Sequence, residues 1–318
     1  MLDSNSPLTP WILSQTGARA VIDSTLVQEL WNGYGELLRI RLDGGRCESV
    51  ILKRVVPPAD VEDSISDRRK RRSYEVERAW YQHGAPLCDD SCRVALCLGV
   101  CPQRSLLLLE DLRHSGFKTS PDPTTEQVES GLAWLASFHS RFLRESPTGL
   151  WEQGSYWHFQ TRKLEWGEME PGIHKEHAAL FDKALRSTKF RTVVHGDPKP
   201  PNFCWNDRQR AAAVDFQYVG SGCGIRDVAL FLDRGLGRLR CRTEESVWLD
   251  RYFSLLQKAL QKDEKDLDFQ ALQTDWRARF PVAWSDYARF ALGWSKSYRP
   301  DDYTVELAKR ALDFCGAL

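Results

Sequence analysis

The residues best suited to chemistry lie in one segment, in which apolar stretches lead into polar loops. Residues 192–194 lead into a loop over residues 195–202 that contains Asp197 and Asn202. An apolar Ala-Val pair then leads into Asp215. Because short β-branched and apolar runs favour strands, we expect two adjacent strands that bring two carboxylates and an amide together at their ends.

This set of side chains meets the needs of phosphoryl transfer. One carboxylate must orient or deprotonate an acceptor hydroxyl, and further oxygen ligands must hold the Mg²⁺ that neutralises nucleotide phosphates. Asp197 and Asn202 have the spacing of a kinase catalytic loop, with Lys199 between them, and Asp215 takes the place of the metal-binding carboxylate. The competing interpretation is a hairpin whose Asp, Asn, Gly and Pro only form turns.

The loop and the downstream Asp resemble the aminoglycoside phosphotransferase, choline kinase and ecdysteroid kinase-like group of small-molecule kinases, whose members carry a His-Gly-Asp loop. The resemblance covers nearly the whole chain. It implies an α+β, two-lobed protein-kinase-like fold, with an N-terminal antiparallel sheet plus helix and a larger, mainly helical C-terminal lobe. It also implies that Asp197 is the catalytic base, that Lys199 approaches the transferred phosphoryl group, and that Asn202 and Asp215 bind Mg²⁺.

The surroundings of the loop carry further signals. Asp227 resembles the structural Asp of the family, which braces the active-site loops, and His195 is expected to order the loop. Pro198, Pro200 and Pro201 depart from the commoner versions of the loop. They stiffen it and leave the side-chain roles open.

A kinase of this kind also needs a strand lysine and a helix glutamate upstream. Lys53 ends an apolar run, where a buried lysine is otherwise costly, and it resembles the lysine that contacts the α and β phosphates. Glu77, followed by two aromatic residues, resembles the helix glutamate and is expected to pair with Lys53. Glu75 is the competing partner, and because two positions turn a helix by about 200°, only one of the two can face the strand.

Two other segments complete the expected nucleotide site. Gly33 and Gly35, between a helix-like start and the strand at Leu37, could let backbone amides approach phosphate oxygens. A simple turn is an equal alternative, because the third glycine of the usual kinase loop is missing. Glu110 and Leu112 resemble the ends of the hinge whose backbone hydrogen-bonds adenine.

Elsewhere the pattern predicts a strand-rich first third and a helical remainder. Paired strands are expected at 37–42 and 49–55. Further predictions are a helix at 66–83, strands at 93–99 and 105–109, and helices from Thr124 or Thr125 onward, at 174–186, 244–261, 275–294 and 303–314, with Pro281 kinking or splitting the 275–294 helix. We divide the chain into a nucleotide-binding lobe at residues 1–109, a hinge at 110–113 and a C-terminal lobe at 114–318 that carries the catalytic loop and acceptor site.

The composition and charge of the chain limit the kinds of partner that it can bind. The 318 residues include 44 basic and 44 acidic side chains, so no overall charge attracts nucleic acid. No apolar run is long enough to span a membrane, the N-terminus lacks the pattern of an export signal, and the nine cysteines are expected to be thiols. We therefore expect a cytoplasmic protein without nucleic-acid or membrane partners.

Two local clusters have alternative interpretations. The basic run at residues 68–72 could bind phosphate or direct nuclear import, but a solvated helix face is the preferred interpretation. Cys88, Cys92, Cys97 and Cys101 could ligate zinc, but none of their pairs has the two-residue spacing of a zinc knuckle. Buried small side chains are the preferred interpretation there.

The acceptor site of the family lies in the helical lobe, which is rich in tryptophan. An aromatic cage for an ammonium group would suit Trp faces with nearby acids such as Glu165, Glu168 and Asp286, and core packing is the preferred alternative, as it is for His139 on the apolar face of its helix. The tryptophans concerned are Trp151, Trp157, Trp166, Trp248, Trp276, Trp284 and Trp294.

The function expected is ATP-dependent transfer of a phosphoryl group to a hydroxyl of a small molecule, with ATP and Mg²⁺ as cofactors. The alternative is a catalytically silent nucleotide-binding regulator of the same fold, which would lack a catalytic group. A protein kinase is disfavoured, because the chain has no Ala-Pro-Glu motif after Asp215.

Overall fold

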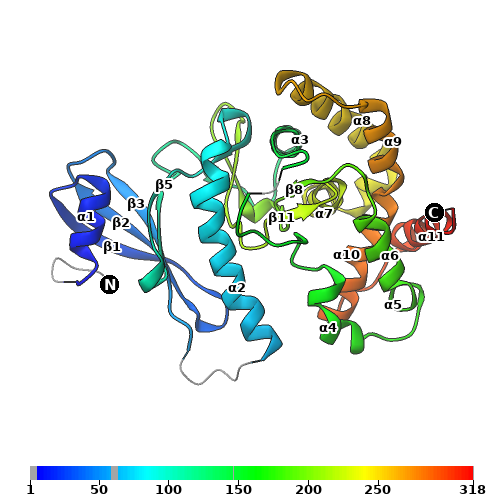
Figure 1. Ribbon diagram of the computed structural model, residues 1–318, viewed down its shortest axis with the longest axis horizontal. Coiled ribbons are helices and arrows are strands. Elements are labelled where there is room, and N and C mark those ends of the chain that lie inside the picture. The colour runs from blue at the N-terminus through cyan, green and yellow to red at the C-terminus, as the bar shows by residue number, and fades with distance from the viewer. Residues whose placement is uncertain (1–5, 59–63, 146, 318) are drawn as a thin grey trace.

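A five-stranded antiparallel sheet forms one end of the molecule and helices form the other (Figure 1). The computed structural model describes residues 6–58, 64–145 and 147–317; the first five residues, part of the segment assessed for an export signal, lie outside this range. The strands run in the order β1-β2-β3-β6-β5. Their bounds are β1 Ala20–Glu29, β2 Gly35–Asp43, β3 Ser49–Val55, β5 Cys97–Cys101 and β6 Leu106–Glu110.

Alternation along β3 divides its side chains between two faces. Val50 and Leu52 pack with the helix α1, Thr9–Thr16, in one apolar cluster, whereas Ile51 joins the main core on the opposite face. Because Lys53 lies two residues after Ile51, its side chain points to the same face of the sheet as that of Ile51. The predicted pairing of 37–42 with 49–55 is confirmed. The start of the chain is helical at α1, as expected, but β1 at residues 20–29 lies between this helix and Gly33 and was not predicted.

The long helix α2, Ile65–Ala79, lies between the sheet and the helical part (Figure 1). Ser64 caps it by accepting a hydrogen bond from the Asp67 backbone at 3.1 Å. A single π-helical turn at Trp80–Gly84 extends it, so the predicted helix at 66–83 is present.

The rest of the chain is mainly helical, as predicted. Thr124 forms a capping box with Gln127 at the start of α3, and Pro281 lies in the first turn of α10, so the predicted split of the 275–294 helix is confirmed. The helices are α3 Thr125–Arg141, α4 Lys163–Gly167, α5 Ile173–Glu176, α6 Ala178–Arg186, α7 Ile225–Leu236, α8 Arg238–Lys262, α9 Phe269–Ala278, α10 Phe280–Trp294 and α11 Asp302–Gly316. Helix α7 was not predicted.

Two small sheets lie among these helices and support the polar loops. One has the order β4-β10-β9-β7 and the other pairs β11 with β8. Their bounds are β4 Arg93–Val94, β7 Lys118–Thr119, β8 Thr192–Val194, β9 Phe203–Trp205, β10 Ala211–Ala213 and β11 Gly220–Gly222. The predicted strand at 93–99 is therefore divided between β4 and β5, which belong to different sheets.

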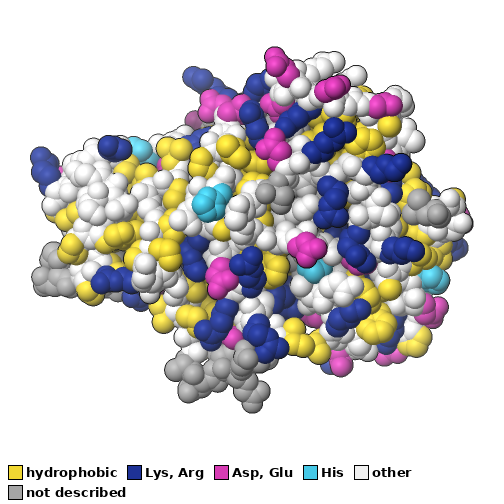
Figure 2. Space-filling view, viewed as in Figure 1, with side chains coloured by type: hydrophobic (Ala, Val, Ile, Leu, Met, Phe, Trp, Pro, Cys, Tyr) yellow, Lys and Arg dark blue, Asp and Glu magenta, His cyan; other side chains and the backbone are white. Residues whose placement is uncertain are grey.

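The surface charges, the helices and the cysteines bear on the expectations drawn from the composition. Basic and acidic side chains are interspersed on the face shown in Figure 2. Across the described helices, none is long and apolar enough to cross a membrane. All nine cysteines are free, and within the described ranges no three His, Cys, Asp or Glu side chains converge as a metal site.

Candidate active site

The polar loop after β8 is held by buried hydrogen bonds to its backbone. Both carboxylate oxygens of Asp227 accept, from the His195 N–H at 2.6 Å and from the Gly196 N–H at 3.1 Å. His139 lies in the core with Nε2 3.2 Å from the same carboxylate. Asp227 thus braces the loop from α7, and His139 is a core residue with hydrogen-bond partners.

His195 links this loop to the second polar segment. Its Nδ1 lies 3.2 Å from the backbone N–H of Asp197, and its Nε2 lies 3.0 Å from the Val214 carbonyl. Burial lowers the pKa of His195, so the ring is neutral and can accept at Nδ1 while donating at Nε2. His195 orders the loop as expected.

The strands that precede the two carboxylates are not neighbours. β8 pairs with β11, whereas β10 pairs with β9 and β4, so the prediction of adjacent strands is wrong. The loops meet through other contacts, because the Val214 N–H also donates to the Asn202 carbonyl at 2.9 Å.

Asp197 has one engaged oxygen and one free oxygen. Its Oδ2 accepts from Lys199 Nζ at 2.8 Å and from Asn202 Nδ2 at 3.0 Å. Its Oδ1 is buried and has no hydrogen-bond partner in the described part of the chain. Burial raises the pKa of Asp197 to about 6, against the opposing effect of Lys199. A carboxylate of this kind is suited to accept a proton from a bound group.

Asp215 lies opposite this loop in a left-handed backbone conformation, with φ of 67°. Burial raises its pKa, but the nearby cations Lys53 and Lys199 outweigh that effect, and the net shift is downward. Its Oδ1 is buried without a hydrogen-bond partner among the described residues. Asp215 is therefore an ionised carboxylate with free coordinating capacity.

Asn202 and Asp215 fit a magnesium ion. The Asn202 amide nitrogen donates to the Asp197 carbonyl and carboxylate, which leaves its oxygen for a ligand. Asp215 supplies Oδ1, which accepts no hydrogen bond from the described residues. Mg²⁺ prefers oxygen and is commonly held by one or two protein ligands plus substrate phosphates. The donor set matches that requirement.

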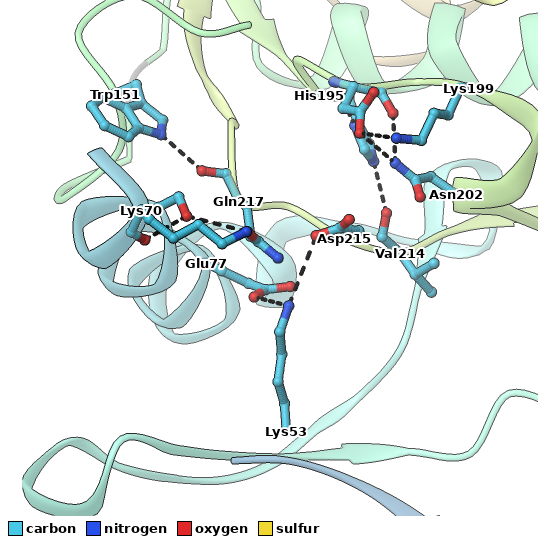
Figure 3. A network of polar contacts seen from close by, with 12 residues as sticks. Lys53, Lys70, Glu77, Trp151, His195, Lys199, Asn202, Val214, Asp215 and Gln217 are labelled. Atoms are coloured by element: carbon cyan, nitrogen blue, oxygen red, sulfur yellow. Dashed lines mark hydrogen bonds and ion pairs between the residues drawn. The ribbon is translucent and has the colours of Figure 1, made fainter. Parts of the chain in front are cut away.

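Lys53 and Glu77 meet beside Asp215, as Figure 3 shows. Lys53 Nζ donates to Glu77 Oε2 at 2.5 Å and lies 3.8 Å from Asp215 Oδ1. Burial alone would lower the Lys53 pKa, but the two carboxylates raise it, so the lysine stays charged. Glu75 points away and pairs with Arg72 at the surface. The predicted choice of Glu77 over Glu75 is confirmed.

Phe216 connects α2 to the catalytic loop. Its fully buried ring stacks on Trp80 with centroids 4.8 Å apart and lies 4.6 Å from the His195 ring. Because Trp80 directly follows α2, this packing fixes the helix that carries Glu77 relative to the loop that carries Asp197.

The predicted glycine loop lies at the tip between β1 and β2. A Cβ on Gly35 would lie 2.0 Å from the Arg54 carbonyl, so this glycine is required where β2 begins alongside β3. Gly33 has φ of 72°. In the same tip, the Trp31 ring lies 6.2 Å from the Trp294 ring of α10, which brings the loop against the helical part.

The predicted hinge is tied to its surroundings by side chains. The Glu110 N–H donates to the Leu96 carbonyl at 2.9 Å, so it is engaged within the protein, and the Glu110 carboxylate accepts from Arg93. Leu112 is buried. Asp111, which the sequence analysis gave no role, accepts from Arg39 at 2.6 Å and anchors the hinge to β2.

Two of the three acids considered for an ammonium cage form ion pairs within the protein. Glu165 pairs with Arg162 at 2.8 Å and Asp286 pairs with Arg226 at 2.5 Å, so these acids are already neutralised. Among the tryptophans, Trp157, Trp248, Trp276 and Trp284 are buried in the core, whereas Trp294 is 51% exposed. Core packing therefore accounts for most of them.

Sequence reasoning missed the part of α2 that faces the catalytic loops. Ser73 donates to Gln217 Oε1 at 3.2 Å, and Lys70 Nζ lies 3.5 Å from the same atom. Positions 70, 73 and 77 share one helix face, so the assignment of Glu77 could have revealed the others. The interpretation of residues 68–72 as a solvated face is wrong for Arg69 and Lys70, because Arg69 donates to the Thr161 carbonyl at 2.6 Å.

Comparisons with known proteins agree with this geometry. A sequence profile described as the phosphotransferase enzyme family matches residues 38–267. The chain is similar to a crystal structure of a putative fructosamine-3-kinase from Thermobifida fusca, with 18% identity, coverage of 96% of this chain and 99% of that one, and a TM-score of 0.55. It is also similar to a microcompartment-associated aminopropanol kinase, with 12% identity, coverage of 96% and 94%, and a TM-score of 0.51. No curated protein sequence matches it. These likenesses confirm the two-part, protein-kinase-like α+β fold.

Proposed function

Because the chain belongs to the phosphotransferase enzyme family, we propose that it transfers the γ-phosphoryl group of ATP to a hydroxyl group of a small molecule. The observation that carries this proposal is the free Oδ1 of Asp197. This oxygen is buried and without a partner among the described residues, and it belongs to a carboxylate whose other oxygen is fixed by Lys199 and Asn202.

In the reaction we propose, the acceptor oxygen forms a bond to the γ-phosphorus while the bond from the γ-phosphorus to the bridging oxygen breaks. The acceptor proton moves to Asp197 Oδ1, and ADP leaves with the bridging electron pair. Lys199, beside Asp197, faces the developing charge on the transferred group. Bound Mg²⁺ supplies charge neutralisation of the phosphates, with Asn202 and Asp215 as its protein ligands.

The nucleotide binds, in this account, between the sheet and the helical part. Lys53, held by Glu77, contacts the α and β phosphates. The tip with Gly33 and Gly35 covers the phosphates. The backbone of residues 110–113 receives adenine, with the Leu112 N–H as donor because the Glu110 N–H is already engaged with Leu96. We assign residues 1–109 and 114–318 to the two lobes on either side of this hinge.

The acceptor is a small molecule bound on the helical side of Asp197. There the Tyr156 N–H donates to the Gly196 carbonyl at 3.1 Å, and Arg162 Nε donates to the Tyr156 carbonyl at 2.6 Å.

The nine free thiols suit a reducing compartment, and we place the protein in the cytoplasm.

An ATP-consumption screen over a library of hydroxyl compounds, with and without Mg²⁺, tests the proposal. We expect Mg²⁺-dependent formation of ADP and of a phosphate monoester with at least one acceptor. Tight Mg²⁺-ATP binding with no turnover on any acceptor would instead identify a silent nucleotide-binding regulator.

A further inference from the structure

Two lysines beside Asp215 have their own carboxylate partners. Lys53 pairs with Glu77 at 2.5 Å, and Lys199 pairs with Asp197 at 2.8 Å. The pKa of Lys199 is shifted upward because Asp197 outweighs the effect of burial. The charges of both lysines are thus balanced within the protein before any phosphate binds.

A third lysine reaches the same place, where among the described residues its ammonium group lies beside the neutral Gln217 and Tyr74. Lys70 extends from α2 toward Asp215, with Nζ 3.5 Å from the amide oxygen of Gln217 (Figure 3) and 5.0 Å from the centre of the Tyr74 ring. Within residues 6–58, 64–145 and 147–317, no carboxylate forms an ion pair with Lys70. Burial lowers its pKa to about 8, although Asp215 acts in the opposite direction.

The position of Lys70 on its helix indicates what it faces. Lys70, Ser73 and Glu77 lie on one side of α2, and Glu77 holds the lysine assigned to the α and β phosphates. Lys70 is two turns nearer the start of the helix, beside Gln217, which follows Asp215 by two residues. A half-buried ammonium group that forms no ion pair with the described residues is stabilised by an anion that enters the site.

On the basis of the phosphotransferase function proposed above, we propose that Lys70 is a third phosphate-contacting lysine, which takes the terminal phosphates of ATP as its counter-charge. Gln217 and Tyr74 hold the side chain in place before the nucleotide binds. The lysine in the middle of the basic run is then part of the substrate site, whereas the exposed Arg68 and Arg71 are not.

Isothermal titration with AMP-PNP, ADP and AMP, each with Mg²⁺, tests this inference in wild type and Lys70→Met. If Lys70 contacts the terminal phosphates, its removal should weaken nucleotide affinity more as the number of phosphates increases. We expect Kd for AMP-PNP to rise on the order of tenfold or more, Kd for ADP to rise less, and Kd for AMP to stay unchanged. Lys70→Arg should restore most of the AMP-PNP affinity.

Arg72→Met is the matched control, because it removes the same charge from the same helix at a side chain that donates to the Gly149 carbonyl. It should leave all three affinities unchanged. If Lys70→Met fails to fold, Lys70→Gln removes the charge and keeps a polar side chain beside Gln217.

Three results would overturn the inference. An unchanged AMP-PNP affinity in Lys70→Met would show that Lys70 does not contact the terminal phosphates. Equal losses for all three nucleotides, together with a lower melting temperature, would make Lys70 a structural link between α2 and Gln217. Wild-type protein that binds no AMP-PNP would refute the proposed phosphotransferase function itself, which distinguishes that failure from the failure of Lys70 alone.

Discussion

Lys53 on β3 and Glu77 on α2 form a buried ion pair of 2.5 Å, with Asp215 as a second carboxylate 3.8 Å from the lysine. A buried lysine requires such partners to stay charged. The pair therefore connects the sheet, the helix and the metal-binding segment of the proposed site.

The two residues should behave as one unit in kinetics. Lys53→Ala and Glu77→Ala should each reduce kcat/KM for ATP strongly, and the double variant should lose much less than the sum of the two free-energy changes. Steady-state kinetics on the four proteins gives the coupling, and Glu75→Ala is the control, because Glu75 lies on the surface with Arg72. Additive losses would show that the two side chains act independently.

Asp215→Ala should weaken nucleotide binding in a Mg²⁺-dependent manner. Removal of the carboxylate leaves the phosphates poorly neutralised. Thermal-shift titrations with ATP, in Mg²⁺ and in EDTA, should show that the Mg²⁺-dependent part of the stabilisation is lost. A variant with the full Mg²⁺-dependent shift would place the metal elsewhere.

Activity should fall on the acid side near pH 6. Asp197 must be ionised to accept a proton, and burial raises its pKa in the free protein to about 6, so kcat/KM should decrease about tenfold per unit below that pH. Lys199 lowers the Asp197 pKa, so Lys199→Met should move the acid limb to higher pH. Circular dichroism across the range would confirm that the protein stays folded, and a limb near pH 4 would contradict the assignment.

Gly196→Ala should destabilise the protein more than Gly116→Ala. Both glycines have φ above 80°, but a Cβ on Gly196 would lie 2.2 Å from the Tyr218 carbonyl, whereas Gly116 has open space around it. A positive φ alone costs an alanine about 1 kcal/mol of stability. At Gly196 the clash adds to this cost, because the Tyr218 backbone must move. Urea unfolding of the two variants measures the difference in the free energy of unfolding. Equal losses of stability would show that the loop that carries Gly196 relaxes without cost.

The sequence predicted the parts of the site that are defined by spacing along one element. Asp197, Lys199 and Asn202 share a short loop, so their spacing in the sequence was enough to group them. Helix geometry allowed only one of Glu75 and Glu77 to face the strand, and the aromatic residues that follow Glu77 selected it.

Features that depend on tertiary packing were not predictable in this way. The pairing of β8 with β11 is set by contacts that leave no local pattern, so the expectation of adjacent strands failed. The charge run at residues 68–72 was assigned to solvent because composition does not show that α2 lies against the helical part. Asp286 was considered as an acid of an ammonium cage. Its pairing with Arg289, three positions along α10, could have been expected from helix spacing, whereas its pairing with Arg226, 60 positions away, could not.

The central claim is that Asp197 accepts the acceptor proton while ATP is held by other residues. ³¹P NMR of a reaction with an acceptor from the screen, together with the affinity for AMP-PNP, tests it in wild type and Asp197→Asn. With wild type we expect a phosphate monoester signal and ADP. With Asp197→Asn we expect AMP-PNP affinity within about threefold of wild type and turnover reduced about 10²- to 10⁴-fold. Near-wild-type turnover by Asp197→Asn would show that Asp197 does not accept the proton.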